Sequence, residues 1–281
     1  MSVKIPEVKE LFKAGVYFGH QRSRTDARSS EYIYGFQNKI AVIDLEKTRE
    51  LLVGAFSFLE GKAQNGAMIL FVGTKLQAKD KVKEVAEKLG MPYVVERWPG
   101  GLLTNYEIVT KSIKKMLKTE ADIAENKYEY LTKKERLKIE KDLNKQHLTF
   151  GGLRKLDRLP DVVFIVDASQ ENSAIREAKR KDIPLVAICD TNANPREIDY
   201  PILANDDSRN SIDLIMGLVE QTIRENYKAK VQANDANTKE RLEKNLNKPE
   251  EKKEEKKMPQ SVKETKKPEA KKAKKEKDGK N

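Results

Sequence analysis

A run of five apolar residues, 68–72, constrains the fold of this chain more than any other stretch. A strand with one face in water alternates apolar and polar residues, whereas this run is apolar throughout, as expected for a strand buried on both faces. It is too short for a buried helix, and Gly66 and Gly73 bracket it. We therefore predict a central strand of a parallel sheet that helices cover on both sides.

The residues after this run predict a strand–helix–strand unit. Residues 77–89 show a helical pattern whose apolar face consists of Val82, Val85, Ala86 and Leu89. Gly90 and Pro92 stop this helix, and residues 93–95 predict the next strand. We expect the crossover that joins the two strands to be right-handed.

Strands and helices alternate through most of the chain, which predicts the three-layer α/β class. Residues 162–166 and 185–189 are again continuously apolar. Residues 199–202 predict an edge strand, because Pro201 would break the ladder of a central one. Asp44 is placed to cap the first long helix. The helices that we expect cover residues 5–14, 45–64, 173–181 and 208–227, and two short strands cover residues 32–34 and 40–43.

Residues 105–149 differ from this pattern and predict an inserted antiparallel helical hairpin. Their apolar stripes are thin and lie in a strongly charged background, and residues 126–132 form the turn between two helices. We expect this hairpin to add little to the core. The α/β body then covers residues 1–104 and 150–227, and a tail covers residues 228–281.

The positive charge of the chain is concentrated in this tail. The tail holds 19 Lys and Arg against 11 Asp and Glu, a net charge of +8 out of +11 for all 281 residues. A segment with so many charges and so few apolar residues cannot bury enough surface to fold alone, so we expect it to be disordered. The body is only mildly basic, and its net charge by itself does not indicate nucleic-acid binding.

Cysteine content and hydropathy bear on the compartment of the protein. Cys189 is the only cysteine, which excludes a disulfide framework and fits a reducing environment. No apolar run is long enough to span a membrane, and residues 1–7 lack the apolar core of a signal peptide. We expect a soluble cytoplasmic protein.

Three loops, residues 73–75, 167–169 and 190–192, follow strand ends, at the edge where parallel sheets bind ligands. A nucleotide enzyme is one hypothesis, but residues 73–75 lack the longer glycine-rich loop of a P-loop, and no G-x-G-x-x-G opens a helix. A plain strand–turn–helix joint is the interpretation that we favour there. Cys189 closes a buried strand with no histidine near it, so we interpret it as a core residue.

Metal binding is a second hypothesis for this edge. His20, Asp190 and the pair Asp206 and Asp207 are all placed in loops of the body. One imidazole with two or three carboxylates suits zinc or a harder divalent ion, and we predict that they form one cluster able to hold zinc. The alternative is that residues 206–208 start and cap the last helix. We expect no required cofactor.

Six short motifs occur in order along the chain. They cover residues 71–75, 97–105, 131–135, 159–161, 190–192 and 205–207. Any one of them is weak evidence, whereas six in order are specific. Together they resemble the S-two family of bacterial small-ribosomal-subunit proteins, and the resemblance covers about residues 5–227.

The resemblance implies a flavodoxin-like parallel sheet of about five strands with an inserted helical hairpin, and it implies no catalysis. It implies binding, in the ribosome, to small-subunit ribosomal RNA and to neighbouring ribosomal proteins. The large messenger-binding protein built of OB-folds is among these partners where it is present. A nucleotide- or metal-dependent enzyme on the same α/β frame is the alternative function.

The candidate RNA contacts are basic residues in a polar loop and along the first hairpin helix. Guanidinium forks and a row of ammonium groups together suit phosphate binding, although a solvated face is the alternative for any single Lys. The sequence departs from the family twice. Residues 25–29 replace a usual Trp-Asn-Pro-Lys-Met run, which removes an aromatic ring, and Pro99 replaces a usual Leu. The candidates are Arg22, Arg24, Arg28, Lys39, Lys75, Arg97, Lys111, Lys114, Lys115 and Lys118.

Overall fold

The computed structural model describes residues 4–246, with the side chains among them described up to residue 227. The chain divides into two units, residues 1–237 and 238–281, and the features below belong to the first apart from the end of the final helix. None of the helices in the described range combines the length and the apolar composition that a membrane span needs.

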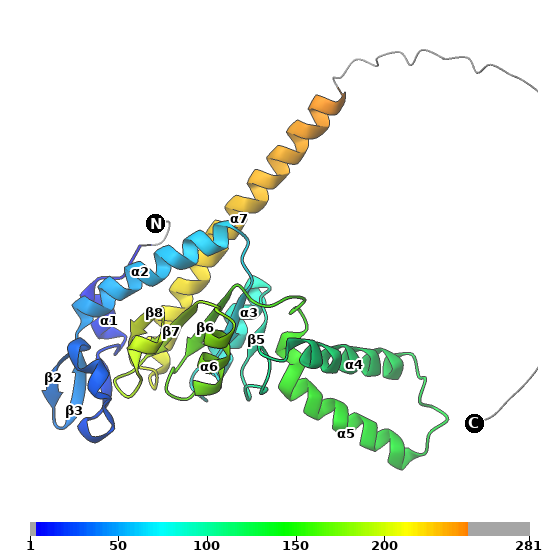
Figure 1. The fold of residues 1–281 in the computed structure, drawn as a ribbon, viewed down its shortest axis with the longest axis horizontal. Helices are drawn as coiled ribbons and strands as arrows, with labels where there is room; N and C mark the ends of the chain where they lie inside the picture. The colour runs from blue at the N-terminus through cyan, green and yellow to red at the C-terminus, as the bar shows by residue number, and fades with distance from the viewer. Residues whose placement is uncertain (1–3, 247–281) are drawn as a thin grey trace, which may run out of the picture. The chain divides into compact units, whose positions relative to one another are not determined.

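The described residues contain a five-stranded, fully parallel sheet (Figure 1). β4 lies between β5 and β6, so the winding of the chain reverses at the β4–β6 pair, as in flavodoxin-like folds. The predicted α/β class is confirmed, and β8, which carries Pro201, is at an edge as expected. In spatial order the strands are β5 (Tyr93–Val94), β4 (Ile69–Val72), β6 (Val162–Val166), β7 (Leu185–Cys189) and β8 (Tyr200–Leu203).

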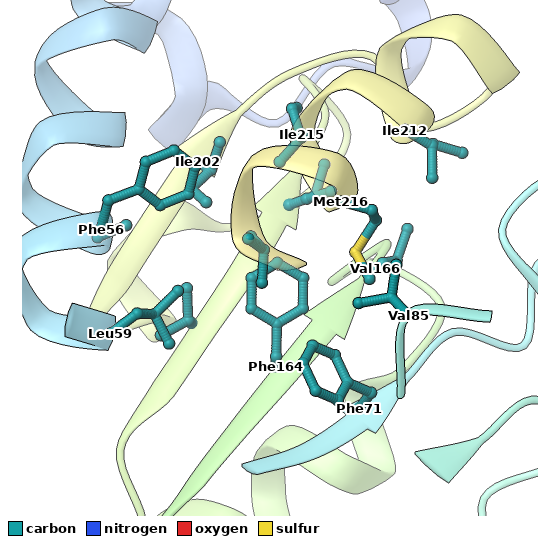
Figure 2. Packing of buried hydrophobic residues seen from close by; sticks show 14 of the residues in the cluster. Phe56, Leu59, Phe71, Val85, Phe164, Val166, Ile202, Ile212, Ile215 and Met216 are labelled. Carbon is teal, nitrogen blue, oxygen red and sulfur yellow. The ribbon is translucent and has the colours of Figure 1, made fainter. Parts of the chain in front are cut away.

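Alternate residues of the central strands enter two separate apolar layers. Ile69 and Phe71 lie in one layer, where the rings of Phe71 and Phe164 are 5.6 Å apart beneath α7 (Figure 2). Leu70 and Val72 lie in the other, which explains why the run shows no polar alternation. The first layer is covered by α1 (Val8–Lys13), α2 (Leu45–Gln64), α3 (Lys79–Leu89) and α7 (Arg209–Leu246), and the second by α6 (Asn172–Arg180) and the start of α4 (Tyr106–Ala124).

A second, antiparallel sheet in the order β1-β3-β2 lies near the N-terminus. The sequence predicts only two of its strands, because residues 18–21 lack the alternation of a strand. Gly19 allows the extra strand, since a Cβ at that position would lie only 2.6 Å from the side chain of Thr191. His20 therefore lies on a strand and not in a loop. The three strands are β1 (Phe18–Gln21), β2 (Ile33–Gln37) and β3 (Ile40–Ile43).

The polar stretch between β1 and β2 forms two short 3-10 helices, η1 (Arg22–Arg24) and η2 (Ala27–Tyr32). The stretch is polar, yet the side chain of Ser29 within it is buried. Its hydroxyl donates to the carbonyl of Ala193 at 2.7 Å. The hydrogen bond satisfies the buried hydroxyl and ties the stretch to the loop after β7.

Single residues at the helix ends determine where three helices begin or end. Asp44 caps α2, because its carboxylate accepts from the N–H of Glu46 at 3.0 Å. α3 ends at Gly90, whose φ of +70° is a left-handed conformation that glycine adopts without strain. α1 is shorter than the expected residues 5–14, since Glu7 forms its capping box.

α4 and α5 (Lys133–Phe150) form a helical hairpin between β5 and β6. Thr132 and Glu135 form a capping box that starts α5. The expectation that the hairpin adds little to the core is wrong for its base, because Val109 and Ile113 belong to the second apolar layer. No residue of α5 is buried, so the outer part of the hairpin is surface.

The last helix, α7, continues past Tyr227, where we expected it to end. No proline or glycine follows Gly217 before Pro249, and the residues between them are mostly compatible with a helix. α7 therefore takes in residues 228–246, which we had assigned to the tail. The remainder of the expected tail, residues 247–281, lies outside the described residues.

Replacing Ile113 by Ala should lower the free energy of unfolding by about 2–5 kcal/mol, because the change leaves a cavity in the core. Ile113 is 4% exposed, whereas Leu137 on α5 is 46% exposed. The matched control Leu137→Ala should change the unfolding free energy by less than about 0.5 kcal/mol. Urea unfolding followed by circular dichroism measures both. A loss at Ile113 within the small range expected for Leu137 would contradict an energetic contribution of the hairpin base to the core.

Candidate functional site

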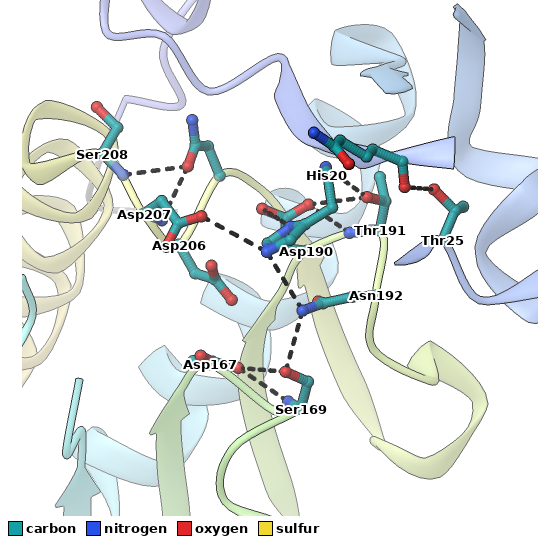
Figure 3. A network of polar contacts seen from close by, with 12 residues as sticks. His20, Thr25, Asp167, Ser169, Asp190, Thr191, Asn192, Asp206, Asp207 and Ser208 are labelled. Carbon is teal, nitrogen blue, oxygen red and sulfur yellow. Dashed lines mark hydrogen bonds and ion pairs between the residues drawn. The ribbon is translucent and has the colours of Figure 1, made fainter. Parts of the chain in front are cut away.

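The carboxyl ends of β4, β6 and β7 meet at one edge of the sheet, where the loops after them converge (Figure 3). β1 supplies an imidazole to this edge, and the segment between β8 and α7 supplies two carboxylates. The position is the switch point between β4 and β6, where ligands bind in folds of this kind. We name the following residues the rim cluster: His20, Lys75, Asp167, Asp190, Asp206 and Asp207.

Two carboxylates hold the ring of His20. Its Nδ1 lies 3.1 Å from Oδ2 of Asp190, and its Nε2 lies 3.5 Å from Oδ2 of Asp207. The N–H of His20 donates to Oγ1 of Thr191 at 2.9 Å, which fixes the backbone as well. The four residues that the sequence predicts as metal ligands are thus together, with one ligand atom of each within 4.8 Å of the others.

Lys75 lies inside this cluster, with its side chain only 14% exposed. Its Nζ is 2.6 Å from Oδ1 of Asp206, 2.6 Å from Oδ1 of Asp207 and 3.3 Å from Oδ2 of Asp167. Lys75 was predicted as a phosphate contact, and these ion pairs do not favour that role. Its ammonium already has three carboxylate partners, and these would repel a phosphate.

The rim cluster holds more acid than base. Burial raises the pKa of Asp206 to about 7, and the charges of Asp167 and Asp190 add to the shift. A hydrogen bond with Asp190 raises the pKa of His20. Burial alone would lower the pKa of Lys75, but its contacts with carboxylates outweigh burial and raise it. The cluster thus favours additional positive charge, either as protons or as a cation.

Two buried oxygens at this edge have no hydrogen-bond partner among the residues that the structure describes. They are Oδ2 of Asp206 and Oδ1 of Asn192. The amide of Asn192 lies beside the cluster, since its Nδ2 is 3.4 Å from Nε2 of His20. Buried acceptors without a donor are costly, and a cation beside them would satisfy them.

The alternative role of Asp206 and Asp207 is to start and cap the last helix, which begins at Arg209. The carbonyl of Ser208 accepts from the N–H of Ile212 at 3.1 Å, so Ser208 stands at the cap position. The Oδ1 of Asn205 accepts from the N–H of Asp207 at 2.8 Å and of Ser208 at 3.1 Å, which forms a turn just before the helix. The two carboxylates are thereby left to face Lys75 and His20.

The remaining basic candidates lie in two groups. One group, on the N-terminal sheet and the stretch after β1, is Arg22, Arg24, Arg28 and Lys39. Arg22 and Arg24 are exposed, and the guanidinium of Arg22 lies 5.1 Å from the ring centroid of Phe36. Arg28 instead donates two hydrogen bonds to Asp26, at 2.9 and 2.7 Å, so its fork is already engaged.

The second group lies along α4. Val109, Ile113 and Met116 form the buried face of this helix. The exposed side carries the predicted Lys row, which is Lys111, Lys114, Lys115 and Lys118. Arg97 is exposed in the loop that leads from β5 to α4.

The comparisons with known proteins identify the family. The family model for ribosomal protein S2 matches residues 11–226. The chain belongs to this family. It is 45% identical over 223 residues to small ribosomal subunit protein uS2 of Geotalea uraniireducens, covering 79% of this chain and 87% of that protein. It is 44% identical over 209 residues to uS2 of Thermus thermophilus, covering 74% and 82%. It is 41% identical over 218 residues to uS2 of Koribacter versatilis, covering 78% and 72%.

Three of the six motifs that carry the resemblance to the S2 family meet at the rim cluster. Residues 71–75 contribute Lys75, residues 190–192 contribute Asp190, and residues 205–207 contribute Asp206 and Asp207. Asp167 was not among the predicted site residues, although the strand-end rule had placed its loop, residues 167–169, at this edge.

The rim cluster should make the protein more stable at pH 6 than at pH 8 when a chelator removes metal. Because the pKa of His20 is raised above 6.5, its contribution is complete below that value and is lost as the pH rises through the raised pKa. Because the pKa of Asp206 is raised from 3.8 to about 7, the folded state holds a proton that the unfolded state releases. Both shifts lower stability as the pH rises.

Urea unfolding at the two pH values tests this expectation. The control is the double variant His20→Gln with Asp206→Asn, which should lose most of the difference between pH 6 and pH 8. A variant that keeps the full difference would show that other groups cause the pH dependence.

Proposed function

We propose that this protein is a structural component of the small ribosomal subunit in the cytoplasm, where it binds ribosomal RNA and neighbouring ribosomal proteins. The observation that carries the proposal is the S2 family match over residues 11–226, together with 45% identity to a relative named small ribosomal subunit protein uS2. The direct test is co-sedimentation of the purified chain with small subunits that lack this protein.

The residues at the switch point of the sheet argue against the alternative, a nucleotide-dependent enzyme. A nucleotide enzyme on this frame would bind phosphate beyond β4 and β6. At that position Lys75 is surrounded by Asp167, Asp206 and Asp207. These three carboxylates would repel a phosphate, and the loop of residues 73–75 is not a glycine-rich phosphate-binding loop.

Two exposed basic surfaces support RNA binding. The Lys row of α4 spans about 10 Å along the helix axis and faces away from the core, so its ammonium groups are available to phosphates. Arg22, Arg24 and Lys39 offer a second surface on the N-terminal sheet, and Arg97 adds a cation in the loop before α4. Arg28 would first have to release Asp26, which makes it the weakest of these contacts.

An apolar surface on the N-terminal part of the body supports a protein partner. Phe12, Phe18 and Tyr34 are exposed, and Tyr34 is 82% exposed. The ring of Tyr17 lies 4.5 Å from that of Phe12 and 4.1 Å from that of Phe18. Exposed aromatic clusters mark interaction sites, and we propose this one for the OB-fold messenger-binding protein that the resemblance implies.

Replacing all four residues of the Lys row by Ala should weaken binding to small-subunit rRNA and flatten its salt dependence. Each lost phosphate contact removes roughly 0.7–0.9 from the slope of log affinity against log salt, because fewer counterions are released. Filter binding or fluorescence anisotropy over a salt series measures the slope.

A second hairpin variant controls for bulk charge. It replaces the exposed residues Lys133, Lys134, Lys138 and Lys141 of α5 by Ala and removes the same charge from the same hairpin. It should leave the slope nearly unchanged. Equal losses from both variants would mean that net charge alone drives binding and that α4 has no specific role.

We further propose that the rim cluster holds one divalent cation, for which zinc is the best match among its ligand types. His20 and three carboxylates are ligands that zinc accepts, and the unpartnered Oδ2 of Asp206 is an oxygen that a cation would satisfy. Ligand atoms around tetrahedral zinc lie roughly 3.3 Å apart, so the cluster must contract from its spread of 4.8 Å. A bound ion would join β1, the end of β7 and the start of α7, which is a structural role.

Zinc and the ammonium of Lys75 should compete, because both need Asp206 and Asp207. Replacing Lys75 by Met should therefore raise the affinity for Zn²⁺ by at least about tenfold, whereas His20→Gln should lower it. Affinity should also fall on acidification, since the raised pKa of His20 lets protons compete from a higher pH. Isothermal titration with Zn²⁺, and Co²⁺ absorption spectra, measure these effects. A Lys75→Met variant that binds Zn²⁺ no better than wild type would contradict the competition.

A further inference from the structure

The carboxylate of Glu177 on α6 is enclosed by the loop that leads into the hairpin. Its Oε1 accepts from Nε1 of Trp98 at 2.9 Å and from the N–H of Gly101 at 2.8 Å. Its Oε2 accepts from the N–H of Leu103 at 3.0 Å and from both the N–H and Oγ1 of Thr104 at 3.1 and 3.0 Å. Five donors from seven consecutive residues thus converge on one buried side chain.

All five donors are neutral, yet they keep Glu177 ionised. Burial alone would raise the pKa of Glu177, but the hydrogen bonds from Trp98 and the loop backbone outweigh it and lower the pKa. Gly101 makes the arrangement possible, because its φ of +84° turns successive N–H groups toward the same anion. The loop is therefore shaped around a charge that belongs to another element.

The position of these contacts matters, because they hold the point where the chain enters the hairpin. The loop ends at Asn105, and α4 begins at the next residue. The chain leaves the hairpin through η3 (Gly151–Leu153), where a Cβ on Gly152 would lie only 2.3 Å from the carbonyl oxygen of Tyr93. The exit is thus fixed by close backbone packing. The entry is fixed by hydrogen bonds to Glu177 together with the apolar packing of Val109 and Ile113 at the base of α4.

We propose that Glu177 is a positioning residue for RNA binding, because its contacts with residues 98–104 fix the direction in which α4 leaves the α/β body. An arm held at both its entry and its exit cannot rotate about either point. The Lys row then stands at a set distance from the basic residues of the N-terminal sheet. Glu177 itself is buried and touches no RNA.

The expected change in RNA affinity rests on the proposed RNA-binding function, whereas the expected change in hairpin position does not. Two basic surfaces on one rigid body bind one RNA more tightly than two surfaces on a loose joint, because the second contact forms at a higher effective concentration. The geometric part of the inference concerns the protein alone and can be measured without RNA.

The test compares Glu177→Gln with wild type by three measurements. Spin labels on Glu50→Cys in α2 and Ala124→Cys at the end of α4, both exposed positions, report the spread of body-to-hairpin distances by pulsed electron resonance. Cys189 is buried and remains unlabelled. The fluorescence of Trp98, the only tryptophan, reports the loss of its hydrogen bond. Anisotropy measures affinity for small-subunit rRNA.

The matched control is Glu220→Gln. Glu220 is a buried carboxylate on α7 whose partners Lys88 and Arg224 lie outside the hairpin. Thr104→Val is the milder variant, because it removes one of the five donors and keeps Glu177 intact. It replaces Glu177→Gln if circular dichroism shows that the latter does not fold.

In Glu177→Gln we expect a broadened distance distribution, a shifted Trp98 emission and an rRNA affinity lower by at least about tenfold. In the background that lacks the Lys row, the same change should lower the affinity no further. Glu220→Gln should behave as wild type in all measurements. A folded Glu177→Gln protein with the wild-type distance distribution would overturn the inference. A broadened distribution with unchanged affinity in both Glu177→Gln and the Lys-row variant would instead overturn the proposed role of the hairpin in RNA binding.

Discussion

The burial of β4 on both faces sets the arrangement of the rest of the body. A strand without a face in water must be covered on both sides, and here helices cover it while β5 and β6 pair with its two edges. Because all five strands of this sheet run parallel, their carboxyl ends lie along one edge. The polar side chains that follow the carboxyl ends of the strands therefore lie close together and pair with one another. These side chains form the rim cluster.

The same edge joins the two sheets of the body. Thr191 accepts from the N–H of His20 through its hydroxyl at 2.9 Å and from the N–H of Asp26 through its carbonyl at 2.8 Å. Gly19 lets β1 approach Thr191 closely. The hydroxyl of Ser29 donates to the carbonyl of Ala193, two residues further along the same loop. The segment that carries Arg22 and Arg24 is therefore bracketed by contacts with the loop after β7, which gives its guanidinium groups a fixed base.

Local sequence predicted the features whose causes are local. Continuous apolar runs marked the central strands, and Asp44 and Gly90 marked helix ends, because capping and left-handed turns depend on single residues. Features made by distant segments were missed. Lys75 looks like a free cation until Asp206, 131 residues away, is brought beside it. Glu177 is one of several charged residues of α6 in the sequence, and nothing near it shows that residues 98–104 will surround it.

The insertion of the hairpin has a consequence for how the chain is synthesised. Met68 and its partner Asp161, which lie directly before β4 and β6, are 93 residues apart in sequence. β4 therefore leaves the ribosome with one edge unpaired, and that edge stays open until the whole hairpin has been made. An apolar strand with an open edge is prone to aggregate. During that interval β5 is the one strand of this sheet with which β4 can pair.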